Sequence, residues 1–195
     1  MSNAYRMSLP AVDVSTAPPR VKEPLEEARK RMGMIPNMYT RMANSPGMFE
    51  TYLHGYERFR KDSGFTPAEQ EVVFLSISAE NGCEYCMAAH SVIADTSSKV
   101  PRDATEAIRG GTVIADVKLR AVAGLTRAVV ATRGHPAVED VKPFLEAGYT
   151  ERQVLEIVLA VAVKTISNYA NHLFETPVDA PFRAREWKAS RRSAA

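Results

Sequence analysis

Cys83 and Cys86, separated by two residues, are the only cysteines in the 195-residue sequence. A disulfide closing so short a loop would stabilise a secreted domain very little, whereas in a reducing compartment this spacing is typical of redox or metal chemistry. His90 follows Cys86 by four positions and Cys83 by seven, so on a helix all three side chains share one face. An imidazole there can take a proton from a thiol and return it to a leaving group.

Asn81 and Gly82 directly precede this group and are residues that end helices. We therefore expect Cys83 in the first turn of a new helix, where free backbone N–H groups and the helix dipole stabilise a thiolate. The first cysteine of such a pair is generally the more exposed, which favours Cys83 for exchange with external thiols. The spacing to His90 instead favours Cys86 as the cysteine that the base deprotonates, so the sequence leaves the attacking cysteine open.

Glu71 lies too far from Cys83 to act with it on one straight helix, because twelve residues span about 18 Å. A turn at Asn81 and Gly82 would fold the two segments antiparallel and bring Glu71 beside His90. A carboxylate in an otherwise apolar helix needs such a partner. We therefore predict a proton relay that runs from Glu71 through His90 to Cys86 and Cys83, with room for one water between the first two.

The pattern E-x11-C-x2-C-x3-H over these four residues resembles the active-site signature of the AhpD-like alkylhydroperoxidases in the carboxymuconolactone decarboxylase superfamily. Stretches around Gly33 and Asn171 resemble its peroxidase-related branch, so the similarity covers about residues 25 to 182. The resemblance implies an all-α, oligomeric thiol peroxidase, or a reductase of a peroxiredoxin disulfide, that needs no cofactor. Carried over by position, Cys83, Cys86, His90 and Glu71 are its catalytic residues.

One departure from that family concerns Tyr85, which stands between the cysteines where well-studied members have a second histidine. A phenol with a pKa near 10 carries protons poorly at neutral pH. The decarboxylase branch lacks the paired cysteines, so the resemblance favours peroxide reduction over the lactone reaction. The expected substrate is a hydroperoxide, and the expected electron donor is a thiol, a dithiol or a peroxiredoxin partner.

Two other interpretations of the same residues remain. The fold could serve as a redox sensor or an assembly module without turnover. Alternatively, Cys83, Cys86, His90 and Glu71 could supply four metal ligands, although structural zinc sites usually have longer spacings and a second ligand pair.

The elements that would position these residues are all helical, since no stretch alternates apolar and polar residues as a strand does. Residues 1–22 are rich in Ser, Ala and Pro and predict an extended arm, followed by a single all-α domain over residues 23–195. Proline and glycine signals place helices at about 25–32, 36–44, 46–59, 102–109 and 116–132, with a shorter one before Gly148.

Two segments resemble each other and could form an internal helical quasi-repeat. Each has Gly, an aromatic residue and Thr, then Glu69 or Gln153 three positions after the threonine, and then an apolar helix. With one inserted residue the second segment lies 85 positions after the first, which places Asn168 and Asn171 where Cys83 and Cys86 stand. Only the first segment would then carry redox chemistry.

Composition bounds the class of protein. The sequence is 45% hydrophobic and 25% charged, with a formal net charge of +2, as in an ordinary globular domain. This balance gives no electrostatic reason to expect a nucleic-acid or membrane partner. The N-terminal residues lack the apolar run of a signal peptide, and the apolar stretch 154–166 is short for a membrane span. We therefore expect a cytoplasmic homo-oligomer.

Overall fold

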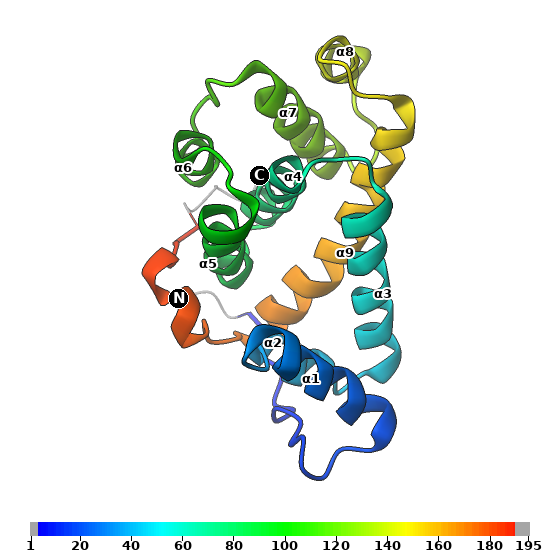
Figure 1. The fold of residues 1–195 in the computed structure, drawn as a ribbon, viewed down its shortest axis with the longest axis vertical. Coiled ribbons are helices and arrows are strands. Elements are labelled where there is room, and N and C mark those ends of the chain that lie inside the picture. Colours follow the sequence, from blue (N-terminus) through cyan, green and yellow to red (C-terminus); the bar gives the residue numbers. More distant parts are fainter. Residues whose placement is uncertain (1–3, 190–195) are drawn as a thin grey trace.

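The computed structural model describes residues 4–189, and all regular structure in that range is helical (Figure 1). The all-α prediction is confirmed. The helices are α1 (Pro19–Met32), α2 (Asn37–Met42), α3 (Pro46–Asp62), α4 (Pro67–Glu80), α5 (Glu84–Ile93), α6 (Arg102–Gly110), α7 (Val117–Ala131), α8 (Val138–Glu146) and α9 (Glu151–Phe174), with a π-helical turn at Ala94–Ser98 and a 3-10 helix at Ala180–Arg185.

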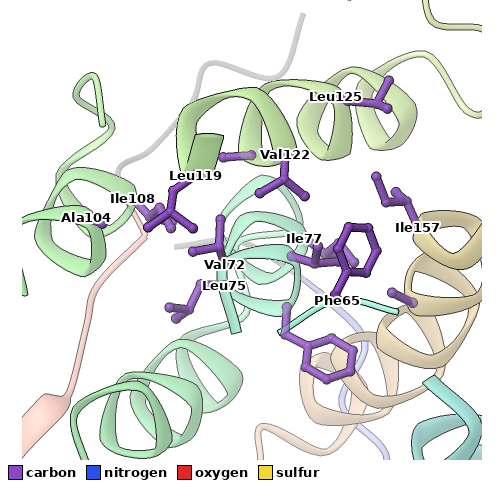
Figure 2. Packing of buried hydrophobic residues seen from close by; sticks show 14 of the residues in the cluster. Phe65, Val72, Leu75, Ile77, Ala104, Ile108, Leu119, Val122, Leu125 and Ile157 are labelled. Carbon is purple, nitrogen blue, oxygen red and sulfur yellow. The ribbon is translucent and has the colours of Figure 1, made fainter. Parts of the chain in front are cut away.

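Helix α4 lies at the centre of the larger core cluster. Thr66 caps it through a capping box with Glu69, as the sequence predicts. Its residues are apolar nearly all round and therefore need neighbours on every side. Figure 2 shows Val72 and Leu75 of this helix in the core shared with Leu119 of α7 and with α6.

Helix α9 extends across both core clusters. Thr150 caps it with Gln153, which confirms the second capping box. Ile157 lies in the cluster around α4, and Ala170 lies in the second cluster, which contains both cysteines. By length and composition alone this helix could cross a membrane, but here it packs against α3, α4 and α5 as a core helix.

The first helix begins earlier than predicted, at Pro19 rather than after Pro24, so the extended segment ends at residue 18. The earlier start follows from Val21, which shares a buried face with Leu25 and Ala28 and extends the helix by more than one and a half turns. The extended segment is held by backbone hydrogen bonds, from Met7 N–H to the carbonyl of residue 173 and from residue 12 to residue 40. Residues 1–3 of the predicted arm and 190–195 of the predicted domain lie outside the described range.

Candidate active site

A tight turn joins α4 to α5 and brings the predicted site together. Gly82 adopts a positive φ of 67°, a conformation that glycine takes without the steric penalty of a side chain. The Cys83 N–H donates to the carbonyl of Ser78 at 2.9 Å, which closes the turn. Cys83 is the N-cap residue of α5 and so stands one position before the predicted first turn. The predicted antiparallel pairing of the two segments is confirmed.

This turn places Glu71 directly against His90. The Oε2 atom of Glu71 lies 2.7 Å from Nδ1 of His90, so no water is needed between them. Both side chains are buried. Since the carboxylate engages Nδ1, the Nε2 atom of His90 is left for chemistry on the other side of the ring.

Arg60 of α3 holds the opposite side of the carboxylate. Its guanidinium forms a very short ion pair with Oε1 of Glu71 and donates to the Tyr56 hydroxyl at 2.8 Å. Sequence reasoning missed this residue, because Arg60 lies in an amphipathic helix where a charged residue is ordinary. Only the packing of α3 on α4 identifies it as the second partner of Glu71.

Charges control protonation in this pair. Burial by itself raises the pKa of Glu71, but the neighbouring His90 and Arg60 outweigh burial and hold this pKa below its usual range. Burial lowers the pKa of His90, and the charge of Lys164 lowers it further, against the opposing effect of Glu71. The site therefore holds an ionised carboxylate beside a neutral imidazole near neutral pH.

Both cysteines are buried free thiols, with 0% of Cys83 and 1% of Cys86 exposed. Neither cysteine is exposed at the surface, because both lie in the second core cluster. Of the two, Cys83 is the one that lines a cavity, in the direction of the expectation that it is the more accessible. Asn171 of α9 lies beside the pair, with its Nδ2 atom 3.4 Å from the sulfur of Cys86 and 3.9 Å from that of Cys83.

The two thiols titrate in opposite directions. The hydrogen bond that Cys83 gives to Cys86, together with burial, raises the pKa of Cys83 well above its usual value. Burial also acts to raise the pKa of Cys86, but the Cys83 hydrogen bond and the charge of Lys164 lower it well below its usual value. These directions favour a thiolate on Cys86, as its spacing from His90 does, over the Cys83 thiolate predicted from the helix terminus.

Three polar residues of α9 complete the surroundings of the cysteines and were not predicted as site residues. Lys164, Asn168 and Asn171 are spaced by four and three positions and are all buried. In the sequence Lys164 only interrupts an apolar run, and the asparagines occur only as the counterparts of the cysteines in the quasi-repeat. A lysine in a helix this apolar is the one signal that could have pointed to the site.

A cavity of about 550 Å³ at the surface borders Cys83 but not Cys86. Cys83 and Asn171 form part of its lining, together with Gly82, Glu84, Tyr85, His172, Glu175 and Thr176. The Tyr85 hydroxyl donates a short hydrogen bond to the carboxylate of Asp179. Burial and that carboxylate raise the pKa of Tyr85, so this phenol ties down the C-terminal segment and carries no proton between the cysteines.

The metal-site interpretation finds no support in the donor geometry. Within residues 4–189, no three His, Cys, Asp or Glu side chains are grouped so that they could hold a metal ion. The carboxylate of Glu71, one of the four ligands considered, is hydrogen-bonded to His90 and ion-paired with Arg60, one partner on each oxygen.

Comparisons with known proteins agree with this fold. Residues 46–128 match the model of the carboxymuconolactone decarboxylase family. No curated protein sequence matches the chain. Among solved structures, an uncharacterized peroxidase-related protein with an AhpD alkylhydroperoxidase core from Ralstonia eutropha JMP134 is 22% identical and superposes with a TM-score of 0.79 over 89% of this chain and 93% of its own.

Two further structures share the fold. An uncharacterized peroxidase-related protein from Silicibacter sp. TM1040 is 17% identical, with a TM-score of 0.75 over 94% of this chain and 99% of its own. A cysteine-to-alanine variant of the debrominase Bmp8, in complex with 2,3,4-tribromopyrrole, is 18% identical, with a TM-score of 0.75 over 92% of this chain and 96% of its own. The chain therefore has the fold of the AhpD-core proteins, and its residues 46–128, which include both cysteines, match the carboxymuconolactone decarboxylase family model.

Proposed function

We propose that this protein is a thiol-dependent reductase of small hydroperoxides that cycles Cys83 and Cys86 between dithiol and disulfide. The observation that carries the proposal is the 2.7 Å contact between buried Glu71 and His90, on the helix pair that also carries the two thiols. A neutral base oriented by a carboxylate, beside a cysteine of lowered pKa, is suited to thiol chemistry at neutral pH.

The catalytic cycle needs only the two cysteines, His90, the hydroperoxide and an external reductant. The Cys86 thiolate attacks the terminal oxygen of the hydroperoxide and the O–O bond breaks. The alkoxide leaves as an alcohol with a proton that His90 relays from solvent. Cys86 is then a sulfenic acid. The Cys83 thiol attacks its sulfur, forms the disulfide and releases water. An external dithiol restores both thiols by exchange and is itself oxidised to a disulfide.

Burial of the cysteines favours a small substrate over a protein disulfide. Thiol–disulfide exchange with a partner protein requires the attacking sulfur to reach the partner's surface. Here 0% of Cys83 and 1% of Cys86 are exposed, and the approach runs through a cavity of about 550 Å³ that borders Cys83. A hydroperoxide of modest size and a small dithiol fit this approach, whereas a folded peroxiredoxin would first need the cavity to open.

The test is steady-state turnover of the purified protein with cumene hydroperoxide and dithiothreitol. We expect catalytic consumption of peroxide, and complete loss of it in Cys83→Ser and in Cys86→Ser. His90→Gln and Glu71→Gln should lower kcat/KM by about 10²- to 10⁴-fold, the usual contribution of a positioned acid–base group.

The outcome also separates the alternatives. A redox sensor would consume one equivalent of peroxide and then stop even with excess dithiothreitol. Turnover with an oxidised peroxiredoxin but not with the free hydroperoxide would replace the proposal with disulfide reduction. Turnover with 2,3,4-tribromopyrrole in place of the peroxide would assign debromination, the activity in the name of one structural neighbour.

A further inference from the structure

One face of α9 presents three buried polar side chains, and each has a polar atom without a hydrogen-bond partner among the described residues. These atoms are Nζ of Lys164, Nδ2 of Asn168 and Oδ1 of Asn171. Their side chains are 0%, 0% and 4% exposed. Buried polar atoms are nearly always paired in folded proteins, so three unpaired atoms on one face indicate a site that acts on a neighbouring group.

Lys164 is the charged member of this face. Its Nζ lies 5.6 Å from the ring centroid of Phe74, and the same ring packs against the imidazole of His90 with centroids 5.0 Å apart. The aromatic contact supplies part of the stabilisation that an ammonium loses on leaving water. It does not supply an anion, and a fully buried ammonium without one is costly.

The groups around Lys164 leave Cys86 as the anion. Glu71 already binds both Arg60 and His90. The titratable groups with which Lys164 interacts electrostatically are Cys83, Cys86 and His90. His90 cannot become an anion at ordinary pH, and the Cys83 thiol donates its proton toward Cys86.

We propose that Lys164 is a positioning residue that holds Cys86 as a thiolate, with the Asn171 amide completing the anion site on the side of the cavity. This inference rests on the proposed dithiol chemistry and identifies the positive charge that stabilises the attacking thiolate. Asn171 donates from Nδ2 toward the sulfur at 3.4 Å, and the charge of Lys164 acts on the same thiol, so the thiolate has a neutral donor and a positive charge beside it. Charge-assisted hydrogen bonds of this kind are the stronger ones.

The other charged and titratable groups around Cys86 do not replace Lys164. They are Cys83 in the turn, His90 and Tyr85 on α5, Tyr52 on α3, and, one contact away, Glu71 on α4. Burial raises the pKa of Tyr52 and of Tyr85, so both stay neutral. Apart from a protonated His90, none of these groups is positively charged, so Lys164 supplies the positive charge that acts on Cys86.

Stabilising the thiolate also affects the redox equilibrium. A dithiol whose reduced form is stabilised has a more oxidising disulfide. Removing Lys164 should therefore make the Cys83–Cys86 disulfide harder to reduce. A tenfold loss of thiolate stabilisation corresponds to a tenfold change in the exchange equilibrium, or about 30 mV for a two-electron couple.

The test uses alkylation and requires no peroxide, so it remains informative even if the proposed peroxidase activity is absent. Full-length Cys83→Ser protein, with and without Lys164→Met, is alkylated with iodoacetamide across pH 5 to 10, and modification of Cys86 is followed by mass spectrometry. We expect Lys164→Met to move the half-maximal pH upward by about one unit or more and to slow alkylation at pH 6 about tenfold. Lys142→Met, at an exposed position on α8, should leave the profile unchanged.

A purely structural role for Lys164 makes the opposite prediction. Methionine has a similar shape and no charge, and replacing a buried charge with a well-packed apolar side chain is often neutral or stabilising. An unchanged alkylation midpoint in a folded Lys164→Met protein would overturn the proposal. Lys164→Gln is the second variant and should give the same upward shift, since it keeps a hydrogen-bond donor and loses only the charge. An unshifted midpoint there would overturn the proposal equally.

Discussion

The amide of Asn171 donates to the sulfur of Cys86, the residue 85 positions before it in the chain. This is the offset at which the two similar helical segments of the sequence correspond. In the second segment Asn171 occupies the position that Cys86 has in the first. The asparagine therefore contacts the thiol of the residue to which it corresponds. The asparagine belongs to the surroundings of the site, and the two segments meet at the cysteines.

The first prediction concerns which cysteine meets the peroxide. In Cys83→Ser, one equivalent of hydroperoxide should convert Cys86 to a sulfenic acid that persists, because the resolving thiol is gone. In Cys86→Ser, Cys83 should react more slowly at pH 7 than Cys86 does in Cys83→Ser, because burial still raises the pKa of Cys83. Dimedone trapping followed by mass spectrometry locates the adduct. Faster trapping on Cys83 than on Cys86 would reverse the assigned order.

The second prediction tests the role of Arg60 as the partner of Glu71. Arg60→Met leaves a buried carboxylate with one partner, so we expect a loss of about 3–5 kcal/mol in the free energy of unfolding. Glu71→Gln combined with Arg60→Met removes the stranded charge and should recover part of that loss. Urea unfolding of the two single variants and the double variant gives the coupling energy. Additive effects would show that the ion pair contributes nothing specific.

The third prediction is the pH dependence of stability. The pKa of His90 is lowered in the folded protein. Below about pH 6.5 the unfolded chain therefore binds a proton at this histidine that the folded protein does not bind. Stability should therefore fall on acidification below that pH, by at most about 1.4 kcal/mol per pH unit for one group. The lowered pKa of Glu71 acts in the same direction below about pH 4.3.

His90→Gln isolates the histidine in that profile, because glutamine keeps a hydrogen-bonding group and does not titrate. Urea unfolding of this variant between pH 7.5 and 5.5 should give a flatter profile than that of the natural sequence. Parallel profiles would assign the acid sensitivity to other groups.

The fourth prediction concerns the close packing of α3 on α9, which sets the position of the Lys164 helix. A Cβ at Gly55 would lie 2.8 Å from Cγ2 of Val163, whose β-branched side chain has little freedom to move away. Gly55→Ala should therefore destabilise the protein by about 1–3 kcal/mol. Gly124→Ala, a helix position with no atom within 4 Å of the new methyl group, should stabilise it by about 0.5–1 kcal/mol. Thermal unfolding of both variants gives the comparison.

The sequence by itself determined the helical class, the two capped core helices and the pairing of Glu71 with His90. Each of these depends on local rules: cap residues, apolar periodicity, and a turn of fixed length between two helical arms. The number of residues from Glu71 to the turn nearly equals the number from the turn to His90. A hairpin at Gly82 therefore places the two side chains next to each other.

Tertiary structure decided which cysteine is the thiolate and how the pair is reached. Arg60 comes from α3, the helix before α4, whereas Lys164 and Asn171 come from α9, far along the chain. The effect of all three depends on which helix packs on which face. Electrostatic effects depend on distance and burial, and neither can be read from sequence spacing once two separate helices are involved. The local dipole argument therefore favoured a Cys83 thiolate, while the assembled charges place the thiolate on Cys86.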